Sequence, residues 1–301
     1  MSEVLKNIIV LIKLEKSNSE ICSMMNITRR ELYNYLTDLK NIGYNFDRIY
    51  KTDGTITYIL QTTYKNNHSE VVEINSMEEE NNINMLLTSD WHIGNQFTRK
   101  DLRDKIPEYC DDKNIHIILN TGDFINGNYG KGNKNESISS QIKTFSKEYT
   151  TSDILMFGAL GDHDASGLFE EGINIKNYLD NYRHDIITEY NNLYIKIKNE
   201  IFCLYHKIPR GAKNPKNARI CFIGHSHKYT ISKNNDGILE ITAPSLSDLV
   251  YTMPTLLELN ITFKDKNISN MTLRQIAFYK RPEIISEVSH TFSKNKTRYK
   301  D

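Results

Sequence analysis

Aspartate and histidine residues stand at the ends of short apolar runs in this sequence, beginning with the segment 86–92. There, Leu-Leu-Thr-Ser is followed by Asp90-Trp91-His92. Side chains at positions i and i+2 of an extended chain point the same way, so Asp90 and His92 can reach one metal ion. An apolar run that ends in a polar break is typical of a buried strand. Because ligands of α/β sheets bind beyond the carboxyl ends of the strands, the segment predicts a metal site.

Later clusters repeat this arrangement further along the chain. Apolar runs at 115–119, 154–157, 201–204 and 220–223 precede them, and the clusters are Gly122-Asp123, Gly161-Asp162-His163-Asp164, His206 and Gly224-His225-Ser226-His227. Carboxylate oxygen and imidazole nitrogen are ligands of divalent transition metals. Glycine lets the backbone turn sharply or approach another group closely. We therefore expect these distant segments to meet at one metal centre.

In this order the clusters resemble the motifs of the calcineurin-like metallophosphoesterase family, DxH, GDxx, GNH(D/E), H and GHxH, over roughly residues 83–260. The resemblance implies an α/β domain at 83–282, a four-layer β-sandwich of two sheets flanked by helices. It also implies two metal ions that share Asp123. The first ion would take Asp90, His92, Asp123 and His227, and the second would take Asp123, Asp162, His206 and His225.

The same resemblance implies hydrolysis of phosphodiester bonds by a hydroxide held between two divalent cations. We expect Mn²⁺, and Fe²⁺, Zn²⁺ or Co²⁺ suit the same ligands. His163, the family's non-ligand histidine, would stabilise the developing charge or protonate the leaving oxygen, and Asp164 would orient its ring. Asp162 stands where the family usually has asparagine. The added carboxylate should tighten cation binding and weaken the pull of the ions on phosphate, and either effect can decide the rate of hydrolysis.

The sequence patterns of residues 1–63 predict a small separate unit. Apolar residues recur at helical spacing in 4–12, a capping box at Thr28–Glu31 opens a further helix, and Asp53-Gly54 joins two short hairpin strands. Three helices and a hairpin resemble a winged helix-turn-helix. In that family the third helix enters the DNA major groove, which would turn outward Arg29, Arg30, Tyr33, Asn34 and Thr37, with Arg48 and Lys51 on the wing.

Winged helices also serve as dimerisation or protein-docking modules, and this alternative stays open for residues 1–63. A polar, acidic linker is predicted at 64–82, with room for a short strand at 71–74. Beyond it the patterns predict helices at 100–109, 137–149 and 169–182, and strands at 193–197, 201–205, 219–223, 238–242, 256–262 and 271–278. Residues 283–301 are predicted to be a helix followed by a basic tail.

Two loops beside the predicted centre bear on the substrate. The segment Lys207–Arg219 carries five basic residues and no acidic one, and a glycine- and asparagine-rich segment at 127–135 carries Lys131 and Lys134. A basic groove beside metal ions favours a polyanion. The start SDWHIG also resembles the DNA-repair exonuclease branch of the family. We therefore expect nucleic acid, with DNA favoured, to contact Lys207, Arg210, Lys213 and Lys216.

Two other functions stay open at this point. One is a phosphatase or phosphodiesterase of a small molecule or phosphoprotein, with the N-terminal unit as a docking module. The other is a non-enzymatic DNA-binding regulator. The net charge of zero over 301 residues gives no global argument for nucleic acid. The four scattered cysteines predict reduced thiols, and neither a signal peptide nor a membrane span is apparent, so we expect a cytoplasmic protein.

Overall fold

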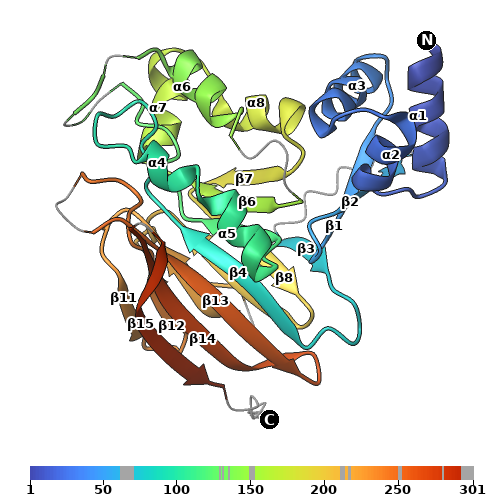
Figure 1. Cartoon of the computed structure of the whole chain (residues 1–301). Coiled ribbons are helices and arrows are strands. Elements are labelled where there is room, and N and C mark those ends of the chain that lie inside the picture. The colour runs from blue at the N-terminus through green and yellow to red at the C-terminus, as the bar shows by residue number, and fades with distance from the viewer. Residues whose placement is uncertain are drawn as a thin grey trace.

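The computed structural model describes residues 1–61, 71–128, 130, 132–134, 136–148, 153–210, 214–215, 218–249, 253–279 and 281–292. In these ranges the strands form two mixed sheets that pack face to face, with helices on the outer face of one of them (Figure 1). This is the α/β architecture that the resemblance implies. No helix in the described ranges is long and apolar enough to cross a membrane.

The first sheet has a parallel half that carries much of the site. Its parallel strands are β4 (Asn82–Thr88), β5 (Ile117–Asn120), β6 (Leu155–Leu160) and β7 (Ile186–Tyr190). The antiparallel strands β13 (Thr255–Lys264), β14 (Asn267–Phe278) and β15 (Pro282–Thr291) extend it beyond β4. The carboxyl ends of parallel strands share one edge of the sheet, so the loops that follow them can build one site.

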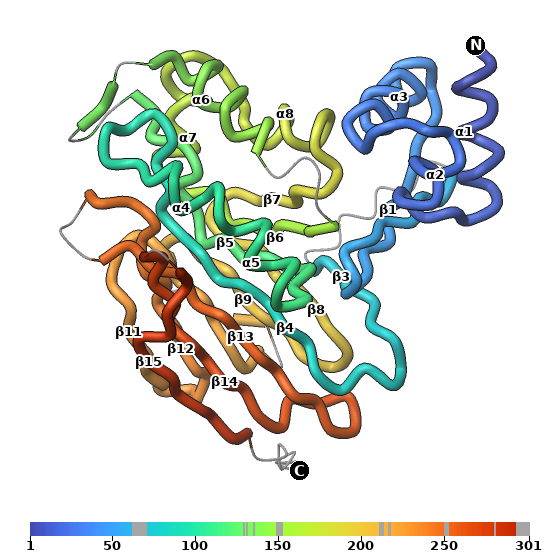
Figure 2. The backbone as a smooth tube through the Cα atoms, in the orientation of Figure 1, coloured from blue at the N-terminus to red at the C-terminus, as the bar shows by residue number. Residues whose placement is uncertain are grey.

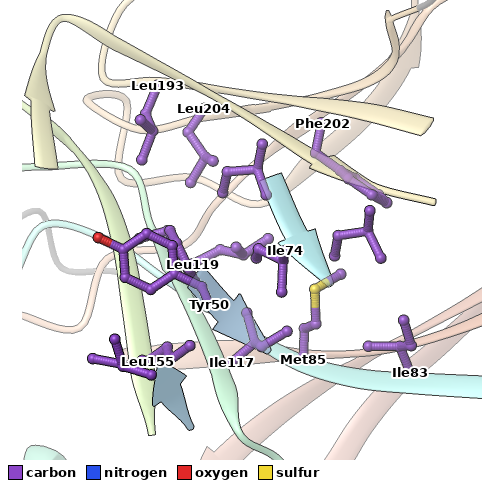
Figure 3. Packing of buried hydrophobic residues seen from close by; sticks show 14 of the residues in the cluster. Tyr50, Ile74, Ile83, Met85, Ile117, Leu119, Leu155, Leu193, Phe202 and Leu204 are labelled. Atoms are coloured by element: carbon purple, nitrogen blue, oxygen red, sulfur yellow. The ribbon is translucent and has the colours of Figure 1, made fainter. Parts of the chain in front are cut away.

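The second sheet has the order β11-β12-β10-β9-β8-β3-β1-β2. The strands from the phosphoesterase-like region are β8 (Asn192–Ile197), β9 (Glu200–Tyr205), β10 (Ala218–Ile223), β11 (Thr230–Lys233) and β12 (Leu239–Thr242). Apolar side chains of both sheets meet in one core, as Leu119, Phe202 and Leu204 show, each at most 1% exposed (Figure 3). Burial of each such side chain stabilises the fold by about 1.5–3 kcal/mol.

Helices cover the opposite face of the first sheet. They are α4 (Lys100–Arg103), α5 (Ile106–Lys113), α6 (Ile138–Phe145), α7 (Asp162–Glu170) and α8 (Ile175–Tyr182). Ile118 and Met156 of the sheet pack there with Phe145 and Leu179 of the helices. The helix predicted at 100–109 is two shorter ones, because Pro107, in the first turn of α5, has no N–H to donate to the preceding turn and so cannot continue α4.

The N-terminal region has the predicted order of helices and a hairpin. It consists of α1 (Glu3–Lys13), α2 (Asn18–Met25), α3 (Arg29–Asn41), β1 (Phe46–Lys51) and β2 (Ile56–Leu60). The capping box at Thr28 and Glu31 is present at the start of α3. Figure 2 shows α3 beside α8, with α1 and α2 further out and with β1 and β3 leading into the body of the molecule.

The short strand for which the predicted linker at 64–82 left room at 71–74 is present as β3 (Val71–Asn75). This strand pairs in parallel with β1 on one side and with β8 on the other, so the hairpin continues the second sheet. Tyr50 of β1 and Ile74 of β3 enter the core between the sheets (Figure 3). Two β-branched valines and an isoleucine favour a strand, and the open edge of β8 gives it a partner. Residues 62–70 lie outside the described ranges.

The helix predicted at the start of 283–301 is wrong, because β15 occupies Pro282–Thr291 and pairs with β14. Ile284, Ile285 and Val288 are β-branched and suit a strand. The basic residues of the predicted tail, Lys294, Lys296, Arg298 and Lys300, lie outside the described ranges. The strands β7 and β11 are present without having been predicted.

Candidate metal centre

The predicted ligands lie where strands end. Asp90 follows β4 by two residues, Asp123 follows β5 by three, and His206 comes directly after β9. His225 and His227 follow β10, and Asp162 opens α7 just after β6. In Figure 1 the arrowhead of β4 points toward α4 and α7, the end of the sheet at which these loops gather.

Six of the seven predicted ligands come together with their donor atoms close. The donor atoms of Asp90, His92 and His227 lie within 4.8 Å of one another, and so do those of Asp123, His206 and His225. Asp123 lies between the two groups, because its Oδ2 is 3.8 Å from Nε2 of His92 and 3.2 Å from Nε2 of His206. This geometry matches the bridging position that the family resemblance implies for Asp123.

The ligand loops hold an uncommon backbone conformation. Among the described non-glycine residues, twelve have positive φ, and five of these are Asp90, His92, Asp123, His225 and His227, at φ of 47° to 67°. Left-handed conformation costs a residue with a Cβ roughly 1–2 kcal/mol. Such strain gathers at functional sites, where the surrounding structure enforces it. The loops are therefore shaped by the position that their side chains must reach.

The donor set fits divalent metal ions. Oδ1 of Asp90 and both ring nitrogens of His92 are buried without a hydrogen bond in the described structure. Buried polar atoms nearly always have partners, so these atoms converge on a position suited to a cation. The imidazole of His92 is also held neutral, because burial, outweighing the nearby carboxylates, lowers its pKa to about 4. A neutral imidazole is the form that binds metal.

His206 shows the same fit from the other side. Its Nδ1–H donates to the carbonyl of Thr121 at 2.8 Å, which turns Nε2 toward Asp123. Burial lowers the pKa of His206, but the hydrogen bond and charge of Asp123 outweigh burial and raise that pKa to about 9. The pocket thus stabilises positive charge between these two side chains, which a bound cation would supply in place of a proton.

Three glycines let the ligand loops approach each other. A Cβ on Gly161 would overlap Oδ1 of Asp123 and lie 2.7 Å from Cγ of His206. A Cβ on Gly122, whose φ is +104°, would lie 2.7 Å from Nδ1 of His206, and one on Gly224 would lie 2.5 Å from the Thr121 carbonyl. Real Cβ atoms do not make such contacts, so these positions require glycine.

His163 faces the centre, but Asp164 does not orient it. The ring of His163 lies edge to face with His92, with centroids 4.6 Å apart, and its backbone N–H donates to Oδ1 of Asp123 at 3.0 Å. Its Nδ1 lies 2.6 Å from the carbonyl oxygen of Asn126, which holds the ring instead of Asp164. The predicted role of Asp164 is therefore wrong. Sequence reasoning missed Asn126, because the contact uses its backbone carbonyl, which every residue type has.

Asp164 instead ties α7 to the loop after β5. Its carboxylate is fully buried and accepts from the backbone N–H of Gly161 at 2.9 Å and of Ile125 at 3.0 Å. A side chain at the third position of a helix commonly reaches back to the N-cap amide. This local bond outcompetes a bond to His163. Burial, with the nearby charge of Asp123, raises the pKa of Asp164 to about 7.

Asp162 is the one predicted ligand that the structure leaves outside the clusters. It is exposed at the first position of α7, and its carboxylate is not among the clustered donor atoms of the described residues. It still acts on the centre electrostatically. Burial and the charges of His206 and Lys207 lower the pKa of His225, while Asp162 opposes them.

The residues predicted to contact DNA lie in different environments. Tyr33 is 2% exposed and stacks on His184 with centroids 5.0 Å apart, so the prediction that it faces outward is wrong. Arg29 forms an ion pair with Asp153, and Arg48 donates to the carbonyl of Asp180 at 3.1 Å. Arg30 and Asn34 are exposed, and Lys51 is half-buried. The face of α3 that carries Arg29 and Tyr33 turns toward α8, because this packing buries the ring of Tyr33.

The basic loop after β9 is described in part. Lys207 and Arg210 are exposed, and the charge of Lys207 contributes to lowering the pKa of His225, after burial and His206. Gly130 of the other basic loop is close to the site, since a Cβ there would lie 3.3 Å from Cε1 of His163. Lys131, Lys213 and Lys216 lie outside the described ranges.

Comparisons with known proteins bear on this site. Residues 83–237 match the model of the family described as calcineurin-like phosphoesterase. No curated protein matches the chain. Similar solved structures include YfcE, a phosphoesterase from E. coli, with 13% identity over 68% of this chain and 98% of that one, at a TM-score of 0.45. A dimetal phosphatase from Danio rerio has 11% identity over 70% and 99%, at a TM-score of 0.44.

Proposed function

The chain belongs to the calcineurin-like phosphoesterase family, and from this premise we propose that it is a dimetal phosphodiesterase whose substrate is nucleic acid. The observation that carries the proposal is the position of Asp123 between the two ligand clusters, with its Oδ2 3.8 Å from Nε2 of His92 and 3.2 Å from Nε2 of His206. Two ions side by side suit in-line displacement at phosphorus. We place the enzyme in the cytoplasm, as the reduced cysteines predict.

The residues present define where the ions would bind. Asp90, His92, Asp123 and His227 would hold one ion, and Asp123, His206 and His225 would hold the other, with Asp162 beside it. Bound ions supply charge for the phosphate and a water nucleophile at neutral pH. Mn²⁺ is our first choice, and Fe²⁺, Zn²⁺ and Co²⁺ suit the same oxygen and nitrogen donors.

The chain's own groups would complete the chemistry. The carbonyl of Asn126 holds Nδ1 of His163, so Nε2 is the atom that would donate a proton to the leaving oxygen or stabilise charge on phosphate. The backbone N–H of His163 meanwhile fixes Asp123 at 3.0 Å. His163 thus couples the position of the shared carboxylate to the position of the general acid.

Exposed cations beside the centre support a polyanionic substrate. Lys207 follows His206 directly, and Arg210 and Lys134 are exposed on loops next to the site. Positive side chains that flank a scissile phosphate neutralise the neighbouring phosphates of a strand. A small monoester has no neighbouring phosphates, so these positive side chains contribute less to its binding.

A second candidate function takes support from the way α3 packs. Arg29, Tyr33 and Arg48 are engaged by Asp153, His184 and Asp180 of the phosphoesterase domain. A recognition helix with this face occupied cannot read a major groove through it. These contacts favour an N-terminal unit that serves as a docking module. The enzyme would then act on a small molecule or a phosphoprotein. A winged helix that binds DNA would have to use Arg30 and Asn34, which are exposed.

One assay separates these functions. We would measure Mn²⁺-dependent turnover of bis-p-nitrophenyl phosphate against p-nitrophenyl phosphate, then digestion of single-stranded, duplex and hairpin DNA and of RNA, with Asp123→Asn as the inactive control. The proposal expects the diester to be preferred and a nucleic acid to be cut. Preference for the monoester, with every nucleic acid left intact, would favour the second candidate.

A further inference from the structure

Helices α3 and α8 are neighbours where the N-terminal helices meet the phosphoesterase domain (Figure 1). A groove lies between them. Its volume is about 190 Å³. None of its lining residues belongs to the metal centre, so it is a separate feature of the molecule. The lining residues are Arg30, Tyr33, Asn34, Ser146, Tyr178, Tyr182 and Arg183.

One wall of the groove is aromatic. Tyr178 and Tyr182 lie one helical turn apart on α8, with ring centroids 4.9 Å apart and planes at 44°. The hydroxyl of Tyr178 lies 3.4 Å from Oγ of Ser146, which fixes that ring, while Tyr182 is 45% exposed. An exposed aromatic ring offers a face on which a nucleobase can stack, worth about 1–3 kcal/mol per base.

The opposite wall carries a cation and an amide from α3. Arg30 and Asn34 are one helical turn apart and exposed, and no ion pair joins Arg30 to a carboxylate in the described parts of the chain. Arg183 differs, because it is 4% exposed and its guanidinium is held by Asp185 at 2.8 and 2.9 Å. Arg30 is therefore the cation that can accept an anionic ligand, and guanidinium binds phosphate well.

We propose that this groove binds a nucleotide, with its base against Tyr178 and Tyr182, its phosphate on Arg30, and the Asn34 amide at the base edge. The volume of about 190 Å³ is below the roughly 300 Å³ of ordinary small-molecule sites. It therefore holds the base and leaves the sugar and phosphate at its mouth, where Arg30 is exposed. A free mononucleotide and one nucleotide of a single strand offer the same chemistry, and the test distinguishes them.

The bound nucleotide would join two parts of the molecule. Arg30 and Asn34 belong to the N-terminal region, whereas Tyr178 and Tyr182 belong to the phosphoesterase domain. A ligand that contacts both walls binds the docked arrangement only, so by mass action it stabilises that arrangement. The thermal midpoint of the full chain should then rise with nucleotide concentration in wild type.

The test uses the full chain in the presence of a chelator, so that metal ions contribute nothing to binding. Adenosine 5′-monophosphate, adenosine, inorganic phosphate and a six-nucleotide oligoadenylate are titrated by calorimetry. We expect saturable binding of the monophosphate, and weaker binding of adenosine and of phosphate alone. Arg30→Ala and Tyr182→Ala should each weaken binding about tenfold or more, whereas Tyr182→Phe should retain it.

Matched controls come from another face of the molecule. Tyr279 is 49% exposed and Arg281 is exposed, so Tyr279→Ala and Arg281→Ala should leave binding unchanged. Binding of the oligomer alone, weakened by the same two groove variants, would support the proposal and identify a strand as the source. Absence of binding by every probe, or binding that both groove variants leave unaltered, would overturn it.

Discussion

At the scale of single residues, the metal centre is built from side chains that accept unfavourable backbone conformations. The five ligand positions with positive φ each store a small cost. The cost is offset by the rest of the fold, in which β5 is buried throughout, β4 is buried from Met85 onward, and β10 is buried over Ile220–Phe222. Such ligand positions can be predicted from sequence, because a strand that ends in Asp-x-His or Gly-Asp is a local pattern.

Other residue-scale features could not be predicted. Asn126 holds His163 through its backbone carbonyl, so no side-chain type identifies it. Asp164 looks like a partner for the adjacent His163, yet two backbone amides bind it first. Both outcomes depend on where the loop after β5 passes α7, and that is decided by tertiary packing.

Asp162→Asn should keep or raise phosphoesterase activity. The carboxylate is exposed and outside the clustered donor atoms, so its removal takes away negative charge without removing a donor that the clusters need. An amide oxygen also keeps the family's usual ligand available. The measurement is kcat/KM with a diester at saturating Mn²⁺. A loss of more than about tenfold, or about 1.4 kcal/mol of barrier, would show that the centre depends on this charge.

Gly161→Ala should disable the centre while the chain still folds. The added methyl would overlap Oδ1 of Asp123 and crowd the ring of His206. Changes to the groups that position metal ligands typically cost about 10–100-fold in metal affinity or activity. Manganese affinity by calorimetry and diester turnover are the readouts. Gly237→Ala is the control, because its φ is +78° with nothing within 4 Å of a Cβ. It should cost about 1 kcal/mol of stability and leave turnover unchanged, and equal losses in both variants would contradict the steric account.

At the scale of elements, α3 shows why outward and inward faces are hard to assign from sequence. The helix itself is predictable from its capping box and spacing. Tyr33 lies on the face that packs on α8 rather than on the solvent face, because His184, two residues after the end of α8, supplies the ring on which Tyr33 stacks. The strand β3 was likewise recognisable only as a short possibility, since its partners β1 and β8 are far away in sequence.

The ion pair between Arg29 and Asp153 should contribute measurably to the packing of α3. The Arg29 side chain is 12% exposed and that of Asp153 is 50% exposed, so solvent screens the pair in part. We expect a coupling free energy of about 0.5–1 kcal/mol. Urea unfolding of wild type, Arg29→Ala, Asp153→Ala and the double variant gives this value. A coupling that cannot be distinguished from zero would mean that the contact does not hold α3.

At the scale of the whole molecule, the N-terminal region and the phosphoesterase domain share one sheet and one core. The hairpin of β1 and β2 extends the second sheet through β3. His184 lies at the joint, with the rings of Tyr33 and Tyr58 at 5.0 and 5.7 Å and the Tyr58 hydroxyl 3.2 Å from its Nδ1. The joint is therefore a packed interior, and a boundary drawn at residue 63 does not separate two independent cores.

Acidification should weaken this joint. Burial, together with the positive charges of Arg48 and Lys40, lowers the pKa of His184 well below 6.5 in the folded chain. The unfolded chain takes up the proton first as pH falls through about 6.5, so the contribution of neutral His184 is present above that pH and is lost below it. From pH 7.5 to 5.5 the loss should be about 1.4 kcal/mol.

Urea unfolding at the two pH values, in wild type and in His184→Phe, measures this loss. Phenylalanine keeps the stacked ring and removes the titrating group, which matters because other histidines of the chain also titrate. Wild type should lose about 1.4 kcal/mol more than the variant between pH 7.5 and 5.5. The same loss in both proteins would place the pH dependence elsewhere.

The central claim is that Asp123 joins two metal sites in one phosphoesterase centre. Anomalous scattering from crystals grown with Mn²⁺ tests it most directly. The account predicts two manganese peaks, one on each side of Asp123, with Asp90, His92 and His227 around one and His206 and His225 around the other. In Asp123→Asn crystals grown in the same way, at least one peak should be lost. Manganese bound elsewhere on the chain, with neither peak beside Asp123, would contradict the account.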